Sequence, residues 1–327
     1  MQNIVKSPEE DADASSPFSR LPDEIILQIV NKLIDLKALC FCYLVSKRFS
    51  SIVLQVDAIS FTSSMIDANI PDTNTISDVA RSRPRPTEVS SFFGEAFLSA
   101  KGFLNKFKGV KSLYIELPSV GHRAIDNRCL FKWKVKFGKK SVSFIFLSPN
   151  SICDKDGFYL NGNGDEEEDV DLTSDLIKKK FAISIWCMED VMAWYIMFLH
   201  LLDNLPMLEG VSITDSGRRG RFSLNGEKLS EVKQWWLHPP LEPRKELLGI
   251  PNMVSKCYIP VLNLPVSGYM MKGIFCALME SKNLDGEIDG LLNSEDGFDD
   301  KEEAAYIEAM KEVLEKHRGT EASSINS

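Results

Sequence analysis

The first strong pattern in the chain is a set of apolar residues at helical spacing behind Pro22. Proline suits the first position of a helix, and Asp23 and Glu24 favour the positive end of the helix dipole. Asp35 can cap a second helix and Ser46 a third, because either side chain can accept a hydrogen bond from a free backbone N–H. The pattern therefore predicts three short helices, with apolar positions that include Ile25, Ile26, Ile29, Val30, Leu33, Leu36, Leu39, Cys40, Tyr43, Leu44, Phe49, Ile52, Val53 and Val56.

This helical segment is small for an independent domain. About 40 residues in three helices can bury little apolar surface by themselves. We therefore expect a partner protein to cover some of its apolar residues.

Two later stretches of the chain share one spacing of apolar residues. One runs from Phe103 to Ile115 and the other from Leu201 to Ile213, with apolar counterparts at a constant offset. Each ends in a pattern typical of the strand of a leucine-rich repeat, namely Val110-x-x-Leu113-x-Ile115 and Leu208-x-x-Val211-x-Ile213. The offset is far longer than the roughly 20 to 29 residues of a regular repeat. The spacing thus predicts an irregular, leucine-rich-repeat-like α/β domain, and a true curved array is the alternative.

The rest of the chain mixes strand and helix patterns. Further strands are predicted at Phe131 to Phe137, Ser141 to Leu147, Ser255 to Leu262 and Tyr269 to Leu278. One helix is predicted at Glu189 to Leu202, and another at Lys301 to Arg318 with Ile307, Met310 and Leu314 on one face. The fold class that follows is α+β.

Shifts in composition divide the chain into segments. Residues 62–91 are rich in Ser, Thr, Asn, Asp and Pro, and Arg83-Pro84-Arg85-Pro86 cannot continue a helix, so a linker is expected there. The predicted segments are a disordered tail at 1–17, the helical module at 18–61, the linker at 62–91, an α/β domain at 92–280, an acidic loop at 281–300, a helix at 301–318 and a tail at 319–327.

Composition narrows the classes of function. The net charge of -9 and the pI near 5.2 oppose nucleic acid or anionic lipid as the main partner. The longest apolar run, Val191 to Leu202, is shorter than the roughly 20 residues that a membrane span needs. An odd number of cysteines, seven, fits a reducing compartment. We expect a soluble intracellular protein that binds neither membrane nor nucleic acid.

The helical segment resembles the F-box. The resemblance rests on Leu21-Pro22-Asp23-Glu24-Ile25-Ile26 and, further on, on Val45-Ser46-Lys47-Arg48-Phe49, and it covers roughly Phe18 to Val56. Two positions depart from the usual pattern, because Phe41 stands where many members carry Arg and Phe49 where many carry Trp. The resemblance implies a small three-helix F-box domain in front of the α/β domain.

The resemblance also implies a function. F-box proteins are non-catalytic, substrate-recognition subunits of SCF-type cullin-RING ubiquitin ligases: the F-box binds a Skp-family adaptor, which binds cullin, and the following domain binds a protein target. The residues that match the adaptor contact are Leu21, Pro22, Ile25, Ile26, Ile29, Leu36, Leu39, Val45, Lys47 and Phe49. Two rivals are a non-degradative F-box scaffold and an enzyme with an unrecognised site in the α/β domain.

The layout beyond the F-box is similar to the plant group that includes the auxin up-regulated members. The segments that carry this similarity are Asp35 to Leu39, Val45 to Phe49, Val110 to Pro118 and Tyr258 to Met270. We expect such a protein in the nucleus and cytoplasm.

Two places in the α/β domain are candidates for target binding. Lys132, Lys134 and Lys136 alternate with apolar residues, so one strand face is basic and could capture an acidic or phosphorylated segment. The alternative is the solvated face of an edge strand. Trp235 and Trp236 could form an aromatic recognition patch or pack in the core.

Motifs for catalysis or metal binding are missing from the sequence. The four histidines are dispersed, and no H-E-x-x-H, G-x-S-x-G or paired C-x-x-C occurs. The acidic stretch Asp285 to Asp296 only partly imitates a calcium loop, because its twelfth position carries Asp in place of Glu. We therefore expect no catalytic residue, no metal and no cofactor.

Overall fold

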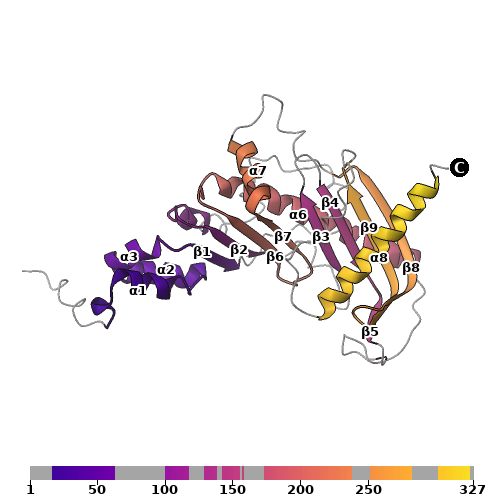
Figure 1. Cartoon of the computed structure of the whole chain (residues 1–327), viewed down its shortest axis with the longest axis horizontal. Helices are drawn as coiled ribbons and strands as arrows, with labels where there is room; N and C mark the ends of the chain where they lie inside the picture. Colours follow the sequence, from indigo (N-terminus) through magenta and orange to yellow (C-terminus); the bar gives the residue numbers. More distant parts are fainter. Residues whose placement is uncertain are drawn as a thin grey trace, which may run out of the picture. The chain divides into compact units, whose positions relative to one another are not determined.

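The computed structural model has mixed helix and strand content, which is the predicted α+β class (Figure 1). It describes residues 17–62, 100–117, 129–137, 142–154, 157, 173–237, 251–281 and 301–324. The chain forms two compact units. Unit 1 contains Met1–Ile115 and His200–Val211, and unit 2 contains Glu116–Leu199 and Ser212–Ser327.

Unit 1 begins with the three predicted helices (Figure 1). They are α1 (Asp23–Val30), α2 (Leu36–Val45) and α3 (Lys47–Val53), and a short 3-10 helix, η3 (Pro17–Arg20), precedes them. Both predicted caps are confirmed. The Asp35 carboxylate accepts a hydrogen bond from the Ala38 N–H at 2.8 Å, and the Ser46 hydroxyl accepts one from the Phe49 N–H at 3.2 Å. These bonds satisfy N–H groups that have no partner within the helix.

The two predicted repeat strands lie side by side. They are β2 (Ser112–Leu117) and β6 (Gly210–Asp215), in a sheet of order β1-β2-β6-β7 with β1 (Ala58–Thr62) and β7 (Arg221–Asn225). The Glu209 N–H donates to the Lys111 carbonyl at 2.7 Å, and the Ser216 N–H donates to the Leu117 carbonyl at 3.0 Å. Because these bonds join the starts and then the ends of the strands, β2 and β6 run in the same direction.

A third segment with the same spacing was missed in the sequence. Its apolar residues fall at the end of α3 and on β1, and the Asp57 carbonyl accepts hydrogen bonds from the N–H groups of Lys111 and Ser112. The corresponding buried residues of the three segments are Val53, Val56, Ile59 and Phe61; Phe107, Val110, Leu113 and Ile115; and Leu205, Leu208, Val211 and Ile213. The last F-box helix is therefore also the helix of the first helix-turn-strand segment. The helical module and the segment that contains β1 therefore overlap in α3.

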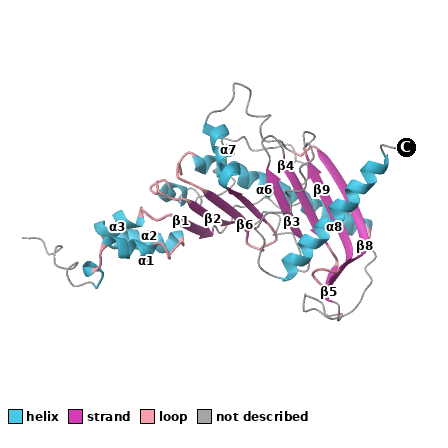
Figure 2. Cartoon of the chain, in the orientation of Figure 1, coloured by secondary structure: helices cyan, strands magenta, loops and turns pink. Residues whose placement is uncertain are grey.

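Unit 2 contains a second, antiparallel sheet (Figure 2). Its order is β3-β4-β9-β5, and β8 pairs with the other side of β9. The strands are β3 (Lys132–Phe137), β4 (Val142–Ser148), β5 (Ser151–Asp154), β8 (Met253–Leu264) and β9 (Tyr269–Glu280). These bounds confirm the four predicted strands to within two residues at each end, and β5 was not predicted.

A helix covers each face of this sheet. α8 (Lys301–Ser324) crosses one face, as Figure 2 shows, and its residues Tyr306, Met310 and Leu314 pack in the core with Ile145 and Cys276. On the other face lies α6 (Ser174–Leu202), where Trp194 contacts Trp133 with ring centroids 5.8 Å apart. Each face of the sheet therefore makes apolar contacts with a helix.

The long helix α6 differs from its prediction. The predicted helix at 189–202 is only its second half, because the polar first turns carry a weaker apolar pattern. Among the described residues, α6 alone is long and apolar enough by length and composition to cross a membrane, and 61% of its most apolar window is buried inside the protein. Such burial is what the core helix of a folded domain shows.

The last helix also differs in detail from its prediction. α8 begins at Lys301 as expected and continues to Ser324. Met310 and Leu314 are buried as predicted, whereas Ile307 is only half-buried. The predicted N-terminal tail, the linker after Thr62 and the acidic loop after Ser281 lie outside the described residues, with the exception of Pro17.

Candidate functional site

The Leu-Pro segment at the start of α1 is held by one arginine from α3. The Arg48 guanidinium donates from Nε to the Asp23 carboxylate at 2.7 Å and from Nη1 to the Phe18 carbonyl at 3.2 Å. Its Nη2 donates to the Leu21 carbonyl. The planar guanidinium can serve three acceptors at once, which a lysine could not do in the same geometry. Arg48 therefore explains why the two halves of the F-box pattern occur together.

The helices of this module leave a large apolar surface uncovered. We call it the F-box apolar surface, and its residues are Phe18, Ile25, Ile29, Leu33, Ile34, Phe41, Leu44 and Val45, between 39% and 72% exposed. Ile25 and Ile29 lie four residues apart on α1, so they share a face of that helix, and Leu33 follows after its end. Monomeric proteins rarely expose large apolar patches, and such patches mark interaction sites.

Helix α2 is apolar on two sides. Its residues Leu36 and Leu39 are buried in the core of the module, whereas Phe41, Leu44 and Val45 are exposed. A helix that is apolar all round is normally buried all round. The exposed side of α2 is therefore suited to a contact with another protein.

The predicted adaptor-binding residues differ in how far the structure exposes them. Pro22, Ile25, Ile29, Val45 and Lys47 are exposed, and Leu21 and Phe49 are half-buried. The other three, Ile26, Leu36 and Leu39, are buried among the helices of the module, so their contact with an adaptor stays a prediction.

Five exposed residues of the F-box apolar surface were missed in the sequence. They are Phe18, Leu33, Ile34, Phe41 and Leu44. The all-round apolar pattern of α2 was the signal that could have found Phe41 and Leu44. Phe18 also supports Phe49, since their rings meet edge to face with centroids 5.7 Å apart.

A cluster around Tyr43 joins the helical module to the rest of unit 1. The Tyr43 ring meets the Phe103 ring at 5.4 Å, and the Lys106 ammonium lies 4.6 Å above the Tyr43 ring and 3.4 Å from its hydroxyl oxygen. The Ser50 hydroxyl donates to the Tyr43 carbonyl at 2.7 Å and so ties α2 to α3. Residues Tyr43 and Phe103, distant in sequence, thus belong to one packed unit.

The predicted basic strand face in unit 2 is not a free surface. Lys132 and Lys134 are both buried, although the alternation of basic and apolar residues on β3 is present. The Lys134 ammonium lies 2.7 Å from the Glu303 carboxylate of α8, and the Lys132 ammonium lies 3.8 Å from it. Both interpretations made from the sequence, an acidic-target surface and a solvated edge, are therefore wrong for these two lysines. Lys136 is half-buried.

The reason for this burial lies at the start of α8. Glu302 and Glu303 follow Lys301 in the first turn, where acidic groups suit the helix dipole. Glu303, itself buried, neutralises cations that would be costly to bury alone.

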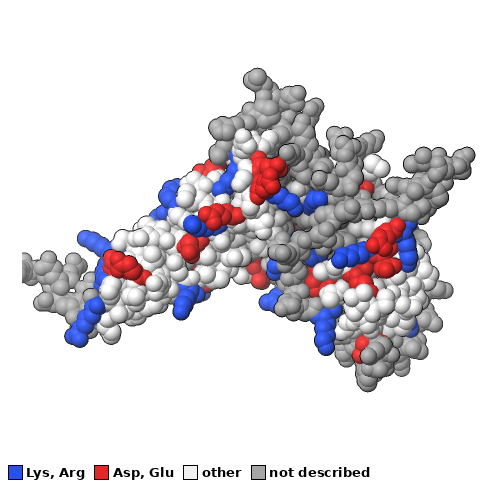
Figure 3. Space-filling view, viewed as in Figure 1, with Lys and Arg blue, Asp and Glu red and all other residues white. Residues whose placement is uncertain are grey.

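Figure 3 shows acidic and basic side chains intermixed on the face in view, without a large area of one sign among the described residues.

The predicted tryptophan patch lies on α7 (Gly226–Leu237). Trp235 and Trp236 are half-buried, and their ring centroids are 6.3 Å apart. The Trp235 Nε1 atom is buried and has no hydrogen-bond partner among the residues that the structure describes. His238, Pro239 and Pro240, which the pattern included, lie outside the described residues.

One buried lysine has no carboxylate among its hydrogen-bond partners. Lys180 on α6 donates to the Ser148 carbonyl at 2.9 Å, to the Asn150 side-chain oxygen at 2.6 Å and to the Gly273 carbonyl at 3.3 Å. Loss of hydration on burial lowers the pKa of Lys180 to about 8. Gly273 has a φ of +58°, in the left-handed region that favours glycine, and its carbonyl accepts one of the Lys180 hydrogen bonds. We infer that the hydrogen bonds of Lys180 stabilise this part of the sheet.

No metal-binding group stands out in the described part of the chain. Within these residues, no cluster of three or more His, Cys, Asp or Glu side chains is placed to hold an ion. The most conspicuous site is therefore the F-box apolar surface with its Arg48 anchor.

Comparison with known proteins agrees with this site. Residues 18–57 match the F-box-like family. The helical module is thus an F-box-like domain, and the exposed and buried residues described above belong to it.

Similarity extends well beyond that domain. F-box protein At4g18380 of Arabidopsis thaliana is 25% identical over 78% of this chain and 81% of its own length. F-box protein AUF2 of the same plant is 25% identical over 66% of this chain and 69% of its own, and AUF1 is 20% identical over 66% and 70%. No solved structure matches. These similarities support the identification of the chain as a plant F-box protein that resembles the auxin up-regulated group.

Proposed function

We propose that the chain is the non-catalytic, substrate-recognition subunit of an SCF-type cullin-RING ubiquitin ligase. The F-box-like domain binds a Skp-family adaptor, and the following α/β part binds a target protein. The observation that carries this proposal is the F-box apolar surface, which coincides with the residues that match the family.

The energetics favour a protein partner for this surface. Complete burial of one Ile, Leu or Phe side chain contributes about 1.5–3 kcal/mol. The eight residues of the surface are partly exposed, so an adaptor that covers them gains several such increments before the costs of association. Arg48 holds the Phe18 and Leu21 backbone in place beforehand, which lowers the cost of ordering on binding.

The expected mechanism is proximity. A ligase subunit that binds an adaptor and a target together raises the effective concentration of target lysines near the activated ubiquitin. This role needs a stiff connection behind the F-box. The shared helix α3 and the Tyr43 cluster supply that stiffness within unit 1.

We further infer that the three helix-turn-strand segments form a short, irregular leucine-rich-repeat-like array. The support is the common spacing of their buried residues and the shared direction of β2 and β6. The array starts inside the F-box, because its first strand follows α3.

For the target we infer a binding site along β8 in unit 2. In the described part of the chain, β8 pairs with β9 alone, so its outer backbone groups are unpaired there. Met253, Val254, Tyr258 and Val261 are exposed along this strand. An open strand edge accepts an extended peptide through main-chain hydrogen bonds, and alternate side chains add selectivity. The inferred ligand is therefore an extended, partly apolar segment of the target.

Co-purification with a Skp-family adaptor tests the proposal. The wild-type chain should retain the adaptor, and the double substitution Leu21→Ala with Pro22→Ala should lose it. Met207→Asp is the matched control, because Met207 is exposed in unit 1 outside the F-box-like domain. Failure of the folded wild-type chain to bind any such adaptor would overturn the proposal.

Target turnover separates a ligase from a scaffold. Proteins captured by the wild-type chain under proteasome inhibition should have longer half-lives after the chain is depleted. Unchanged half-lives would favour a non-degradative scaffold.

A further inference from the structure

Two of the seven cysteines face each other across neighbouring strands of unit 2. Cys257 on β8 is the direct partner of Cys276 on β9 in the antiparallel register. The Cα atoms of such partners lie about 4.5–5.5 Å apart, which is within the roughly 4.4–6.8 Å that a disulfide spans. The strands therefore hold the two thiols at bonding reach without a change of backbone.

The two thiols interact but are not equivalent. Cys276 is buried, whereas Cys257 is half-buried. A hydrogen bond from Cys276 lowers the pKa of the Cys257 thiol, and the same bond together with burial raises the pKa of Cys276. The more accessible sulfur is thus the better nucleophile, and the buried sulfur keeps its proton.

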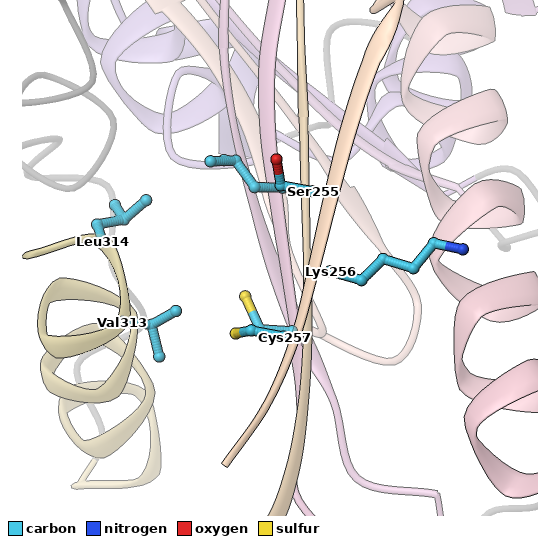
Figure 4. A pocket seen from close by; sticks show the side chains of 7 residues that line it. Ser255, Lys256, Cys257, Val313 and Leu314 are labelled. Atoms are coloured by element: carbon cyan, nitrogen blue, oxygen red, sulfur yellow. The ribbon is translucent and has the colours of Figure 1, made fainter. Parts of the chain in front are cut away.

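A small crevice opens beside the accessible thiol. Cys257, Cys276, Ser255 and the α8 residues Val313 and Leu314 line it. Figure 4 shows Cys257 on the side of Val313 and Leu314, whereas Lys256 points away from them. Its volume is only about 10 Å³, which is room for about one water-sized molecule, so the crevice suits a very small reagent.

We propose that Cys257 and Cys276 form an oxidation site, in which hydrogen peroxide converts the facing thiols into a disulfide between β8 and β9. All seven cysteines are free thiols, but within the register of the described strands Cys257 and Cys276 alone face each other. The other five are Cys40, Cys42, Cys129, Cys153 and Cys187. Cys257 meets the oxidant, and Cys276 completes the bond from within the protein.

The reaction balances in two steps. The Cys257 thiolate attacks one oxygen of the peroxide and breaks the O–O bond; the released hydroxide takes the proton that Cys257 had lost and leaves as water, and Cys257 becomes a sulfenic acid. Cys276 then loses its proton and attacks the sulfenic sulfur, and the hydroxide displaced from that sulfur takes this proton to form a second water. The two sulfurs lose two electrons, and the peroxide gains them.

Peptide mapping of the intact, purified chain tests the proposal. The chain is reduced, freed of reductant, exposed to hydrogen peroxide, alkylated and digested. We expect a linked Cys257–Cys276 peptide that dithiothreitol removes, formed at least about tenfold faster than oxidation of Cys40 or Cys42. Absence of this peptide, or equal oxidation rates at all four sites, would overturn the proposal.

Single substitutions assign the roles of the two sulfurs. Cys276→Ser should let the Cys257 sulfenic acid accumulate, where a dimedone probe can trap it. Cys129→Ser is the control, since Cys129 is also half-buried, and it should form the linked peptide at the wild-type rate. Should either variant misfold, the wild-type rates still decide, because a slow or absent Cys257–Cys276 linkage contradicts the proposal by itself.

Discussion

The F-box helices of unit 1 leave apolar side chains exposed, whereas the sheet of unit 2 buries charged side chains. The F-box-like domain leaves apolar residues such as Leu44 in contact with solvent, 72% exposed. The sheet of unit 2 buries even charged residues, among them Lys134 and Glu303. One region leaves apolar side chains exposed, whereas the other supplies its own counter-charges.

The difference shows which surfaces are available for binding. Lys132 and Lys134 look like a binding face in the sequence, but Glu303 already satisfies them. Leu44 is one of the apolar positions of the second predicted helix, but no other helix of the F-box covers it fully. Whether a residue is available depends on the packing of distant segments, and this packing is what the structure adds.

Removal of the counter-charge in unit 2 should have the largest effect. Glu303→Ala removes the carboxylate 2.7 Å from the buried Lys134 and leaves Lys132 with Glu302 at 4.0 Å, and we expect unit 2 to lose about 3–5 kcal/mol of unfolding free energy. Urea denaturation measures this loss. Glu302→Ala is the matched control with an expected loss below about 1 kcal/mol, because Glu302 is more exposed and lies 4.0 Å from Lys132. Equal losses in both variants would contradict the assigned role of Glu303.

Charges placed on the F-box apolar surface should abolish docking without unfolding the chain. For Ile25→Asp combined with Ile29→Asp we expect about 100-fold weaker adaptor binding, or about 2.7 kcal/mol, because both residues lie on the exposed face of α1. Titration calorimetry measures the affinity, and circular dichroism checks the fold. Val266→Asp, at a residue of unit 2 that is 89% exposed, should leave the affinity unchanged.

The buried Lys180 makes stability depend on pH. Its folded-state pKa of about 8 lies below the ordinary value of 10.5, so between these values the unfolded chain binds the proton that the folded chain has lost. The unfolding free energy should therefore rise with pH across this window, by about 2 kcal/mol. Denaturation at pH 8 and pH 10 tests the slope. Lys180→Met, which cannot titrate, should show a flatter dependence, and an unchanged slope would exclude Lys180 as its cause.

Loss of one helix cap should have the smallest effect. Asp35→Ala removes the acceptor for the Ala38 N–H and should lower the stability of the F-box-like domain by about 1 kcal/mol. Thermal unfolding followed by circular dichroism measures the change. Lys37→Ala, at an exposed neighbour, should change stability by less than about 0.5 kcal/mol.

Local signals in the sequence predicted much of this structure. The caps at Asp35 and Ser46 and the alternation on β3 depend on neighbouring residues, so they can be read without the fold. The common spacing in β2 and β6 also identified two strands that lie side by side.

Features that depend on distant contacts were not predictable in the same way. The burial of Lys134 requires Glu303, which is far away in the sequence. The inward positions of Ile26 and Leu39 require knowledge of how α1, α2 and α3 pack. The helix-turn-strand segment that contains α3 and β1 was missed because α3 had already been assigned to the F-box alone.

Hydrogen exchange with and without a purified Skp-family adaptor tests the central claim most directly. If the adaptor covers the F-box apolar surface, amides of α1 and α2 should exchange more slowly in the complex, while those of β3, β4 and β9 keep their rates. Unchanged exchange in α1 and α2 within a saturated complex would contradict the account, as would a folded chain that fails to bind at micromolar concentration.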